Sequence, residues 1–242
     1  MESCKYPCTP SVPPCPPCPP RPLWQPVSQV KTMRIVAISD THGHHRELDI
    51  PPGDVLVHAG DLTRFGERSE LRDFNNFVGS LPHKHKVIVA GNHDFCFERD
   101  RESCAAELKN CIYLQDDEVT LDGVSFYGSP WQPWFYDWAF NLRRGPEIRA
   151  KWDLIPSQVD ILITHGPPAG VLDRTLQGAA VGCIDLLEVV ERVKPRLHIF
   201  GHIHEGAGII ESDGTTFINA STCNIDYRAV NPPIVFDLTA TS

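Results

Sequence analysis

The 242-residue chain has no apolar run near the ~20 residues that a membrane-spanning helix requires. Its N-terminus also lacks the apolar centre of a secretory signal peptide. Basic residues are fewer than acidic ones, since 22 lysines and arginines face 31 aspartates and glutamates, and the formal net charge is −9. This charge disfavours binding to extended nucleic acid through the phosphate backbone. We therefore predict a soluble, cytoplasmic protein that binds neither membranes nor extended nucleic acid.

The chain also lacks an even number of cysteines. It has nine, so they cannot all pair with one another within the chain. Five of them are scattered through the body and are predicted to be reduced and buried. The other four crowd into a leader rich in proline, where Cys15 and Cys18 have the spacing of half a zinc knuckle. The proline content and the lack of an apolar pattern favour a disordered leader over residues 1–30 instead. The globular domain is predicted to cover residues 31–242.

The body of the chain alternates short apolar runs with amphipathic segments, which is typical of an α/β protein. Runs rich in β-branched residues predict buried strands at residues 34–39, 54–60, 86–90, 160–164 and 197–200. Apolar residues at helical spacing predict connecting helices at residues 68–81, 101–110, 147–153 and 183–194. Short strands that join through a turn at Asp122-Gly123 indicate some antiparallel pairing. We predict a four-layer α/β/β/α sandwich of two mixed β-sheets flanked by helices.

Each of the five buried strands is followed by residues that bind metals well. An Asp-x-His pair follows the first, a single aspartate the second, Asn-His the third, one histidine the fourth and His-x-His the fifth. Ligands of open α/β sheets bind at the carboxyl ends of strands, so these side chains are expected to meet. Alternation along an extended chain also aims both members of each spaced pair at one face. The predicted metal ligands are Asp40, His42, Asp61, Asn92, His165, His202 and His204.

Seven oxygen and imidazole ligands are too many for one ion. They suit Mn²⁺, with Fe²⁺ or Zn²⁺ as alternatives, better than a cysteine-rich structural zinc site. We predict two divalent ions roughly 3.5–4 Å apart, bridged by Asp61, which stands alone at its strand end. Each histidine taken singly also fits a hydrogen-bonded core or surface residue, but the ordered placement of all five motifs favours a shared site. His58 and His198 lie within strands and are predicted to be hydrogen-bonded core residues that support the site.

The ordered series Asp-x-His, Gly-Asp, Gly-Asn-His-Asp, His and Gly-His-x-His resembles the calcineurin-like metallophosphoesterases over residues 33–238. Residues 130–135, 164–168, 200–206 and 218–223 look like the metallophosphoesterase-domain-containing subfamily (239FB type, UPF0046). The resemblance implies that one metal ion is held by Asp40, His42, Asp61 and His204. It implies that the second is held by Asp61, Asn92, His165 and His202. Some mammalian relatives carry glycine in place of His202, which weakens the second metal site and the activity, so histidine here implies the more active kind of enzyme.

The resemblance also implies a metal-dependent phosphodiesterase that hydrolyses cyclic nucleotides or similar small phosphodiesters. A hydroxide between the two ions is the predicted nucleophile. His93 is predicted to be the general acid that protonates the departing alkoxide, with Asp94 orienting its ring. Trp131 and Trp134 are predicted to stack on the nucleobase, and Arg143 to meet a phosphate. The alternative is that these rings fill the core and that the arginine is solvated.

Two other functions stay open at this point. One is a phosphomonoesterase or protein phosphatase, although Arg64 is out of register with the arginine that such phosphatases carry after Gly-Asp. The other is a nucleotide-binding scaffold with little turnover, although no position of the metal-binding set is missing.

Overall fold

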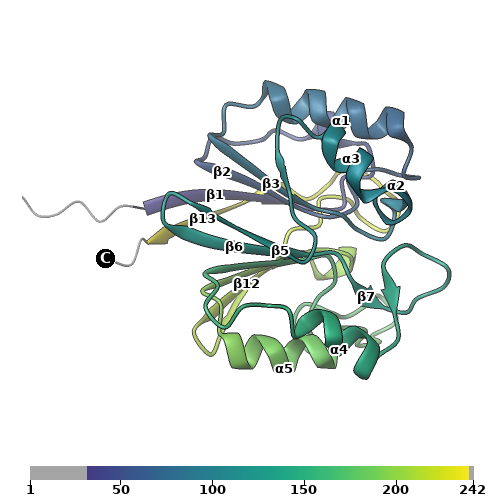
Figure 1. The fold of residues 1–242 in the computed structure, drawn as a ribbon, viewed down its shortest axis with the longest axis vertical. Helices are drawn as coiled ribbons and strands as arrows, with labels where there is room; N and C mark the ends of the chain where they lie inside the picture. Colours follow the sequence, from purple (N-terminus) through teal and green to yellow (C-terminus); the bar gives the residue numbers. More distant parts are fainter. Residues whose placement is uncertain (1–31, 240–242) are drawn as a thin grey trace, which may run out of the picture. The chain divides into compact units, whose positions relative to one another are not determined.

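The computed structural model describes residues 32–239, so the predicted leader over residues 1–30, with Cys15 and Cys18, lies outside the described residues. Two large β-sheets lie face to face, and helices cover the outer face of each (Figure 1). The predicted four-layer α/β/β/α sandwich is therefore confirmed.

The first sheet has five strands in the order β13-β1-β2-β3-β4, and all neighbours are parallel except β13 and β1. The strands are β1 (Thr32–Ile38), β2 (Val55–Ala59), β3 (His85–Val89), β4 (Ile112–Tyr113) and β13 (Ile234–Thr239). The helices on its outer face are α1 (Arg68–Ser80), α2 (Phe95–Arg99) and α3 (Arg101–Glu107) (Figure 1).

The second sheet has six strands in the order β11-β12-β10-β9-β6-β5, with parallel pairs at its centre and an antiparallel pair at each edge. The strands are β5 (Asp117–Leu121), β6 (Val124–Ser129), β9 (Ile161–Thr164), β10 (Leu197–Phe200), β11 (Gly208–Ser212) and β12 (Thr215–Asn219). The helices on its outer face are α4 (Pro146–Trp152) and α5 (Ile184–Val193) (Figure 1). The shorter elements are β7 (Gln132–Pro133), β8 (Asn141–Leu142) and the 3₁₀ turns η1 (His45–Glu47) and η2 (His204–Gly206).

Strand β1 shows how the sequence builds these layers. Ile35 and Ala37 belong to the apolar core between the sheets. Val36 and Ile38 point the other way, because side chains alternate along a strand, and they pack in the core beneath α1. A parallel strand is covered on both faces and therefore reads as a continuous apolar run. The predicted apolar face of α1 is buried at Leu71, Phe74, Phe77 and Val78.

Most differences from the predicted elements are at short segments. The helix predicted for residues 101–110 ends at Glu107, and α2, β7 and β8 were not predicted. Strands β7 and β8 have two residues each, and α2 has five, so none is long enough to show a period in the sequence.

None of the helices in residues 32–239 has the length and apolar character to cross a membrane, and the longest, α1, has 13 residues. The cytoplasmic location stays a prediction.

Candidate metal centre

The predicted ligands come together at one edge of the two sheets. Strands β1, β2 and β3 run parallel in the first sheet, and β9 and β10 run parallel in the second, so their carboxyl ends deliver the ligand loops. Acidic and imidazole residues form three overlapping groups there. Within each group the potential ligand atoms lie within 4.8 Å of one another. Together these groups contain Asp40, His42, Asp61, His93, His165 and His204. Asn92 joins them through its side-chain oxygen, 2.8 Å from Nε2 of His165.

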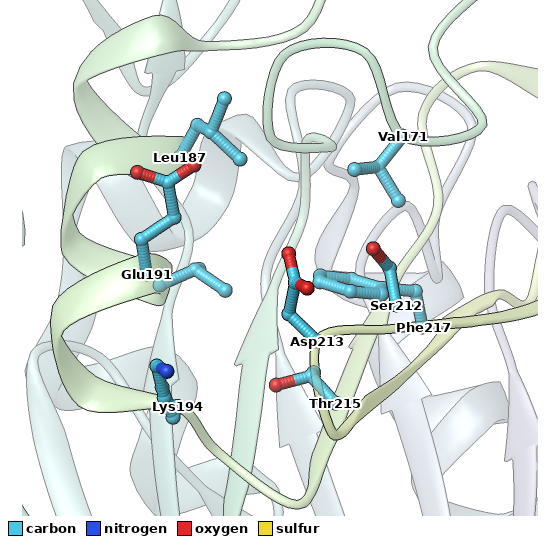
Figure 2. Close-up of a pocket in the computed structure, with 9 residues that line it drawn as sticks. Val171, Leu187, Glu191, Lys194, Ser212, Asp213, Thr215 and Phe217 are labelled. Atoms are coloured by element: carbon cyan, nitrogen blue, oxygen red, sulfur yellow. The ribbon is translucent and has the colours of Figure 1, made fainter.

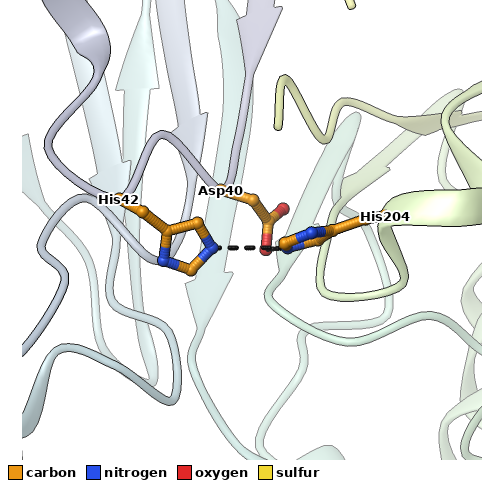
Figure 3. A group of neighbouring side chains, drawn as sticks. All are labelled: Asp40, His42 and His204. Atoms are coloured by element: carbon orange, nitrogen blue, oxygen red, sulfur yellow. Dashed lines mark hydrogen bonds and ion pairs between the residues drawn. The ribbon is translucent and has the colours of Figure 1, made fainter. Parts of the chain in front are cut away.

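Asp40, His42 and His204 form one of these groups (Figure 3). The two Nε2 atoms of His42 and His204 are 3.3 Å apart, and Nε2 of His204 is 3.4 Å from Oδ1 of Asp40. Oδ2 of Asp61 lies 3.8 Å from Nε2 of His42 and 3.5 Å from Nε2 of His165. Asp61 therefore lies between the group around Asp40 and the group around His165, the position expected of a bridging ligand.

His202 is adjacent to these groups but is not a member of them. Its ring centroid is 5.0 Å from that of His165, and it lines the same pocket as Asp61 and Asn92. His202 is thus placed to join the second set of ligands.

The loops that carry the ligands are strained. Four predicted ligands have a positive φ, namely Asp40 at 52°, His42 at 44°, Asp61 at 58° and His202 at 69°. Such a conformation costs about 1–3 kcal/mol for a non-glycine residue and is typical of functional sites. A side chain at Gly91 would collide with the carboxylate of Asp61, and one at Gly201 with that of Asp40. The glycines of both motifs therefore let the backbone pack directly against the acidic ligands.

The donor atoms fit a divalent cation because lone pairs face one another. His165 donates its Nδ1 hydrogen to the carbonyl of Ala59 at 3.0 Å, and His204 donates its own to the carbonyl of Asn224 at 2.9 Å. In the neutral rings Nε2 then carries a lone pair. For His165 that lone pair faces the oxygens of Asn92 at 2.8 Å and Asp61 at 3.5 Å. Acceptors at such distances repel one another unless a positive charge lies among them.

The pKa shifts of these residues also fit a metal site. Burial lowers the pKa of His42 to about 2 and that of His202 to about 3, so both rings are neutral at pH 7, the form that binds metals. Burial also raises the pKa of the Asp61 carboxyl well above its ordinary value. Burial lowers the pKa of His204, but the hydrogen bond and charge of Asp40 outweigh it and raise that pKa to about 9. A proton on Nε2 of His204 thus compensates the negative charge of Asp40, as a bound metal ion would.

Asp94 does not orient His93, so that prediction was wrong. Its Oδ2 accepts hydrogen bonds from the backbone N–H groups of Gly91 at 2.8 Å and Asp61 at 2.9 Å. Its Oδ1 accepts from the backbone N–H of Thr63 at 2.9 Å and from the hydroxyl of Thr63 at 2.6 Å. Asp94 is fully buried and ties the loop after β2 to the loop after β3, and in this way it fixes the position of Asp61.

His93 is held by other groups. Its Nδ1–H donates to the backbone carbonyl of Arg64 at 2.9 Å, and its ring stacks on that of Trp138 with centroids 4.2 Å apart. Its Nε2 faces the centre, 4.0 Å from Oδ2 of Asp61. This arrangement leaves one ring nitrogen free for proton transfer, as predicted for a general acid.

The sequence matches the model of the calcineurin-like phosphoesterase family over residues 33–206. The chain belongs to this family. Human metallophosphoesterase domain-containing protein 1 is 49% identical to it over 232 residues, which cover 85% of this chain and 71% of the human protein. A UPF0046 protein of Caenorhabditis elegans is 40% identical over 225 residues, which cover 87% of this chain and 77% of the worm protein.

Among solved structures, GAP50, the anchor in the inner membrane complex of Plasmodium, matches with a TM-score of 0.50 at 10% identity. The match covers 86% of this chain and 78% of that one, and it bears on the fold alone.

The resemblance inferred from the sequence motifs is confirmed by the family match. The calcineurin-like phosphoesterases are metal-dependent, so this chain is a metal-dependent phosphoester hydrolase.

A pocket of about 220 Å³ opens over the centre of this phosphoesterase. Its walls include Asp61, Asn92, His93, Phe135, Trp138, His202, His204, Glu205, Ile225 and Tyr227. A second cavity of about 310 Å³ adjoins it and shares Phe135, His202 and Glu205 with it. Trp134, Pro167 and Val181 add to the apolar lining of this second cavity. The reacting group and a larger apolar substituent can therefore lie side by side.

Trp131 and Arg143 do not line either cavity, so the cavities give no support to their predicted contact with substrate. The indole N–H of Trp131 donates to both oxygens of Asp116 at 2.9 Å, and the ammonium of Lys151 lies 4.4 Å from its ring centroid. Trp131 is therefore a packing residue. Trp134, in contrast, lines the second cavity with 58% of its surface exposed.

Arg144, the neighbour of Arg143, reaches the second cavity instead. Its guanidinium donates to the carbonyls of Val181 and Gly182, both at 2.8 Å, and thereby shapes the cavity wall.

Five pocket residues were not predicted individually, namely Phe135, Trp138, Glu205, Ile225 and Tyr227. Phe135 and Trp138 lie in the aromatic stretch of residues 131–138, which was predicted to contain base-stacking residues, and Glu205 follows the predicted ligand His204. Ile225 and Tyr227 lie in a loop without periodicity or motif, and nothing in the sequence signalled them.

A separate cavity of about 400 Å³ lies between α5 and the turn that joins β11 to β12 (Figure 2). Leu187, Glu191 and Lys194 of the helix side face Ser212, Asp213 and Thr215 of the turn side. It shares no residue with the metal centre.

Proposed function

We propose that this phosphoesterase is a phosphodiesterase that hydrolyses cyclic nucleotides or similar small phosphodiesters at a dinuclear metal centre. The observation that carries the proposal is the convergence of Asp61 and six further predicted ligands at one edge of the sheets, next to a second cavity of about 310 Å³. One ion would be held by Asp40, His42, Asp61 and His204. The other would be held by Asp61, Asn92, His165 and His202. Mn²⁺ suits this mixture of carboxylate, amide and imidazole ligands.

Divalent cations supply a nucleophilic hydroxide at neutral pH and compensate the charge on the phosphoryl oxygens. The protein supplies the arrangement of the reacting groups. Asp94 holds the Asp61 loop, and the carbonyls of Ala59 and Asn224 orient His165 and His204. Such outer contacts typically change metal affinity or activity about 10–100-fold.

His93 is the proposed general acid. The carbonyl of Arg64 accepts the Nδ1 hydrogen, so a second proton on Nε2 points into the pocket toward the departing ester oxygen. The ring is only 7% exposed and is packed on Trp138, which keeps its direction fixed. An alkoxide leaving group needs that proton, whereas a nitrophenolate does not.

The cavity beside His202 favours a substrate whose phosphate carries a nucleoside or a similar aromatic group. The apolar lining around Trp134 and Phe135 fits the base of a nucleotide. Phe135 borders both cavities, so a ring stacked on it would lie next to the reacting phosphate.

The test is a panel of 3′,5′- and 2′,3′-cyclic nucleotides, bis-nitrophenyl phosphate and nitrophenyl phosphate, assayed with purified protein and Mn²⁺. We expect diester hydrolysis that depends on Mn²⁺ and stops on chelation. Trp134→Ala should raise KM for a cyclic nucleotide and leave bis-nitrophenyl phosphate unaffected. Faster hydrolysis of the monoester would identify a phosphomonoesterase, and no turnover of any substrate would identify a binding scaffold.

A further inference from the structure

Glu205 borders both cavities at the metal centre. It lines the pocket of about 220 Å³ over the predicted ligands and the second cavity of about 310 Å³ beside Trp134. It also lines a third cavity of about 250 Å³, together with Leu176 and Asn224. Glu205 follows the predicted ligand His204 in the turn η2. A ligand that fills the first two cavities must therefore pass this carboxylate.

The loop over residues 170–182 fixes the position of the Glu205 carboxylate. Its Oε1 accepts a hydrogen bond from the backbone N–H of Leu176 at 2.9 Å. The same loop packs closely on η2, because a side chain at Gly206 would collide with the backbone carbonyl of Leu172. The carboxylate therefore has a fixed place at the border of the cavities, although Glu205 is an exposed residue.

The second oxygen of Glu205 and its charge have no partner in the part of the chain that the structure describes, since only Oε1 makes a hydrogen bond. Arg144 lines the same cavity, but its guanidinium donates to the carbonyls of Val181 and Gly182. The hydroxyl of Thr175, which also lines that cavity, is buried without a hydrogen-bond partner among the described residues. Buried or fixed polar atoms without a partner are available to a ligand.

We propose that Glu205 accepts a hydrogen bond from a ribose hydroxyl of the substrate and thereby makes the enzyme selective for ribonucleotides. This inference rests on the proposed function, in which the phosphate lies at the metal centre and the base lies beside Trp134 and Phe135. The sugar joins these two groups, so it lies at the border of the cavities, where Glu205 is. A carboxylate only accepts hydrogen bonds and therefore suits a hydroxyl donor. In a 3′,5′-cyclic nucleotide the 2′-hydroxyl is the only ribose hydroxyl that is free.

The test compares 3′,5′-cyclic AMP with its 2′-deoxy analogue, using the full-length, Mn²⁺-loaded protein. Initial rates give KM for both compounds, and calorimetry gives Kd for the same pair if neither is hydrolysed. The unaltered protein should prefer the ribonucleotide by about tenfold, a factor typical of a hydrogen bond to a charged group. In Glu205→Ala this preference should disappear, because the 2′-hydroxyl then has no partner.

Glu205→Gln separates the contact with the sugar from the position of the loop. Its amide oxygen keeps the hydrogen bond with the N–H of Leu176, but the charge is lost. The affinity for the ribonucleotide should therefore fall by about threefold, and that for the deoxy analogue should not change. Glu191→Ala is the matched control for Glu205→Ala, because Glu191 is an exposed residue of α5 that lines the separate cavity of about 400 Å³. It should keep the tenfold preference.

Three outcomes would overturn the ribose contact. The first is an equal loss of affinity for both nucleotides in Glu205→Ala, which would give Glu205 a structural role or a contact with the base. The second is a tenfold preference that persists in this variant, and the third is hydrolysis by the unaltered protein without any preference. Preferential binding of the ribonucleotide without hydrolysis of either compound would instead overturn the proposed function alone.

Discussion

The two sheets contribute different chemistry to the candidate centre. The loops of the first sheet supply all the oxygen donors, Asp40, Asp61 and Asn92, together with His42. The loops of the second sheet supply imidazoles alone, from His165, His202 and His204. Negative charge thus comes from one sheet alone, and neither sheet holds a complete set. The site depends on the apolar packing between the sheets.

Each sheet also contributes one buried histidine beneath the centre. His58 of β2 donates from Nε2 to the hydroxyl of Thr41, and His198 of β10 donates to that of Thr164, each at 2.9 Å. Each threonine lies next to a candidate ligand in sequence. The prediction that these two histidines are hydrogen-bonded core residues is confirmed, and each supports the ligand loop of its own sheet.

The contrast between the two sheets predicts that loss of a carboxylate from the first sheet lowers the activity most. Asp61→Asn removes the charge shared by both ligand groups, and we expect kcat/KM for bis-nitrophenyl phosphate to fall by roughly 10³-fold or more. Asp213→Asn is the matched control, because it makes the same change in an exposed turn far from the centre, and asparagine tolerates its φ of 50°. Similar activities for the two variants would remove Asp61 from the centre.

The next effect concerns proton transfer on the first-sheet side. His93→Gln should slow hydrolysis of a cyclic nucleotide by about 10²-fold and that of bis-nitrophenyl phosphate much less, since only the alkoxide needs a proton. Steady-state kcat values for both substrates measure the difference. Equal losses would show that His93 is not the acid.

A second-sheet ligand should matter less than Asp61. His202→Gly removes a neutral donor at the edge of the cluster, and we expect the metal content to fall from two ions to one and activity to fall at least tenfold, by roughly the factor typical of weakened metal sites. Elemental analysis after gel filtration gives the ratio. Retention of two tightly bound ions would mean that the second sheet contributes less to the centre than we infer.

The smallest expected effect is on stability at acid pH. Burial lowers the pKa of His198 to about 3 in the folded protein, below the ordinary value near 6.5. Above pH 6.5 the His198 imidazole is neutral in both the folded and the unfolded protein. As the pH falls from 6.5 to 3, this imidazole takes up a proton only in the unfolded protein, so the free energy of unfolding decreases over that range. At pH 5 the loss is about 2 kcal/mol for this residue. Urea unfolding at pH 8 and pH 5 should show a smaller pH-dependent loss in His198→Gln than in the control His85→Gln, and identical losses would contradict this explanation.

The fold and the ligand set could be predicted because both leave local signals in the sequence. Buried parallel strands read as apolar runs, and ligands follow them directly, as Asp40 follows β1 and His202 follows β10. Asp94 was misassigned because adjacency in sequence suggested a contact with His93, whereas its carboxylate turns toward the loop after β2. Tyr227 was missed because its contacts with three imidazoles arise only when the loop before β13 folds over the centre.

The same reason explains the tryptophans. Trp131 and Trp134 are three residues apart in one aromatic stretch, but one binds Asp116 and packs inward while the other lines a cavity. Composition identified the stretch as important. Only the course of the chain through β7 and β8 separates the two roles.

The most direct test of the shared centre is anomalous diffraction from crystals of the full chain grown with Mn²⁺. We expect two manganese peaks about 3.5–4 Å apart, one on each side of the Asp61 carboxylate. Ligands from both sheets should surround each peak. A single peak, or peaks away from Asp61, would contradict the account.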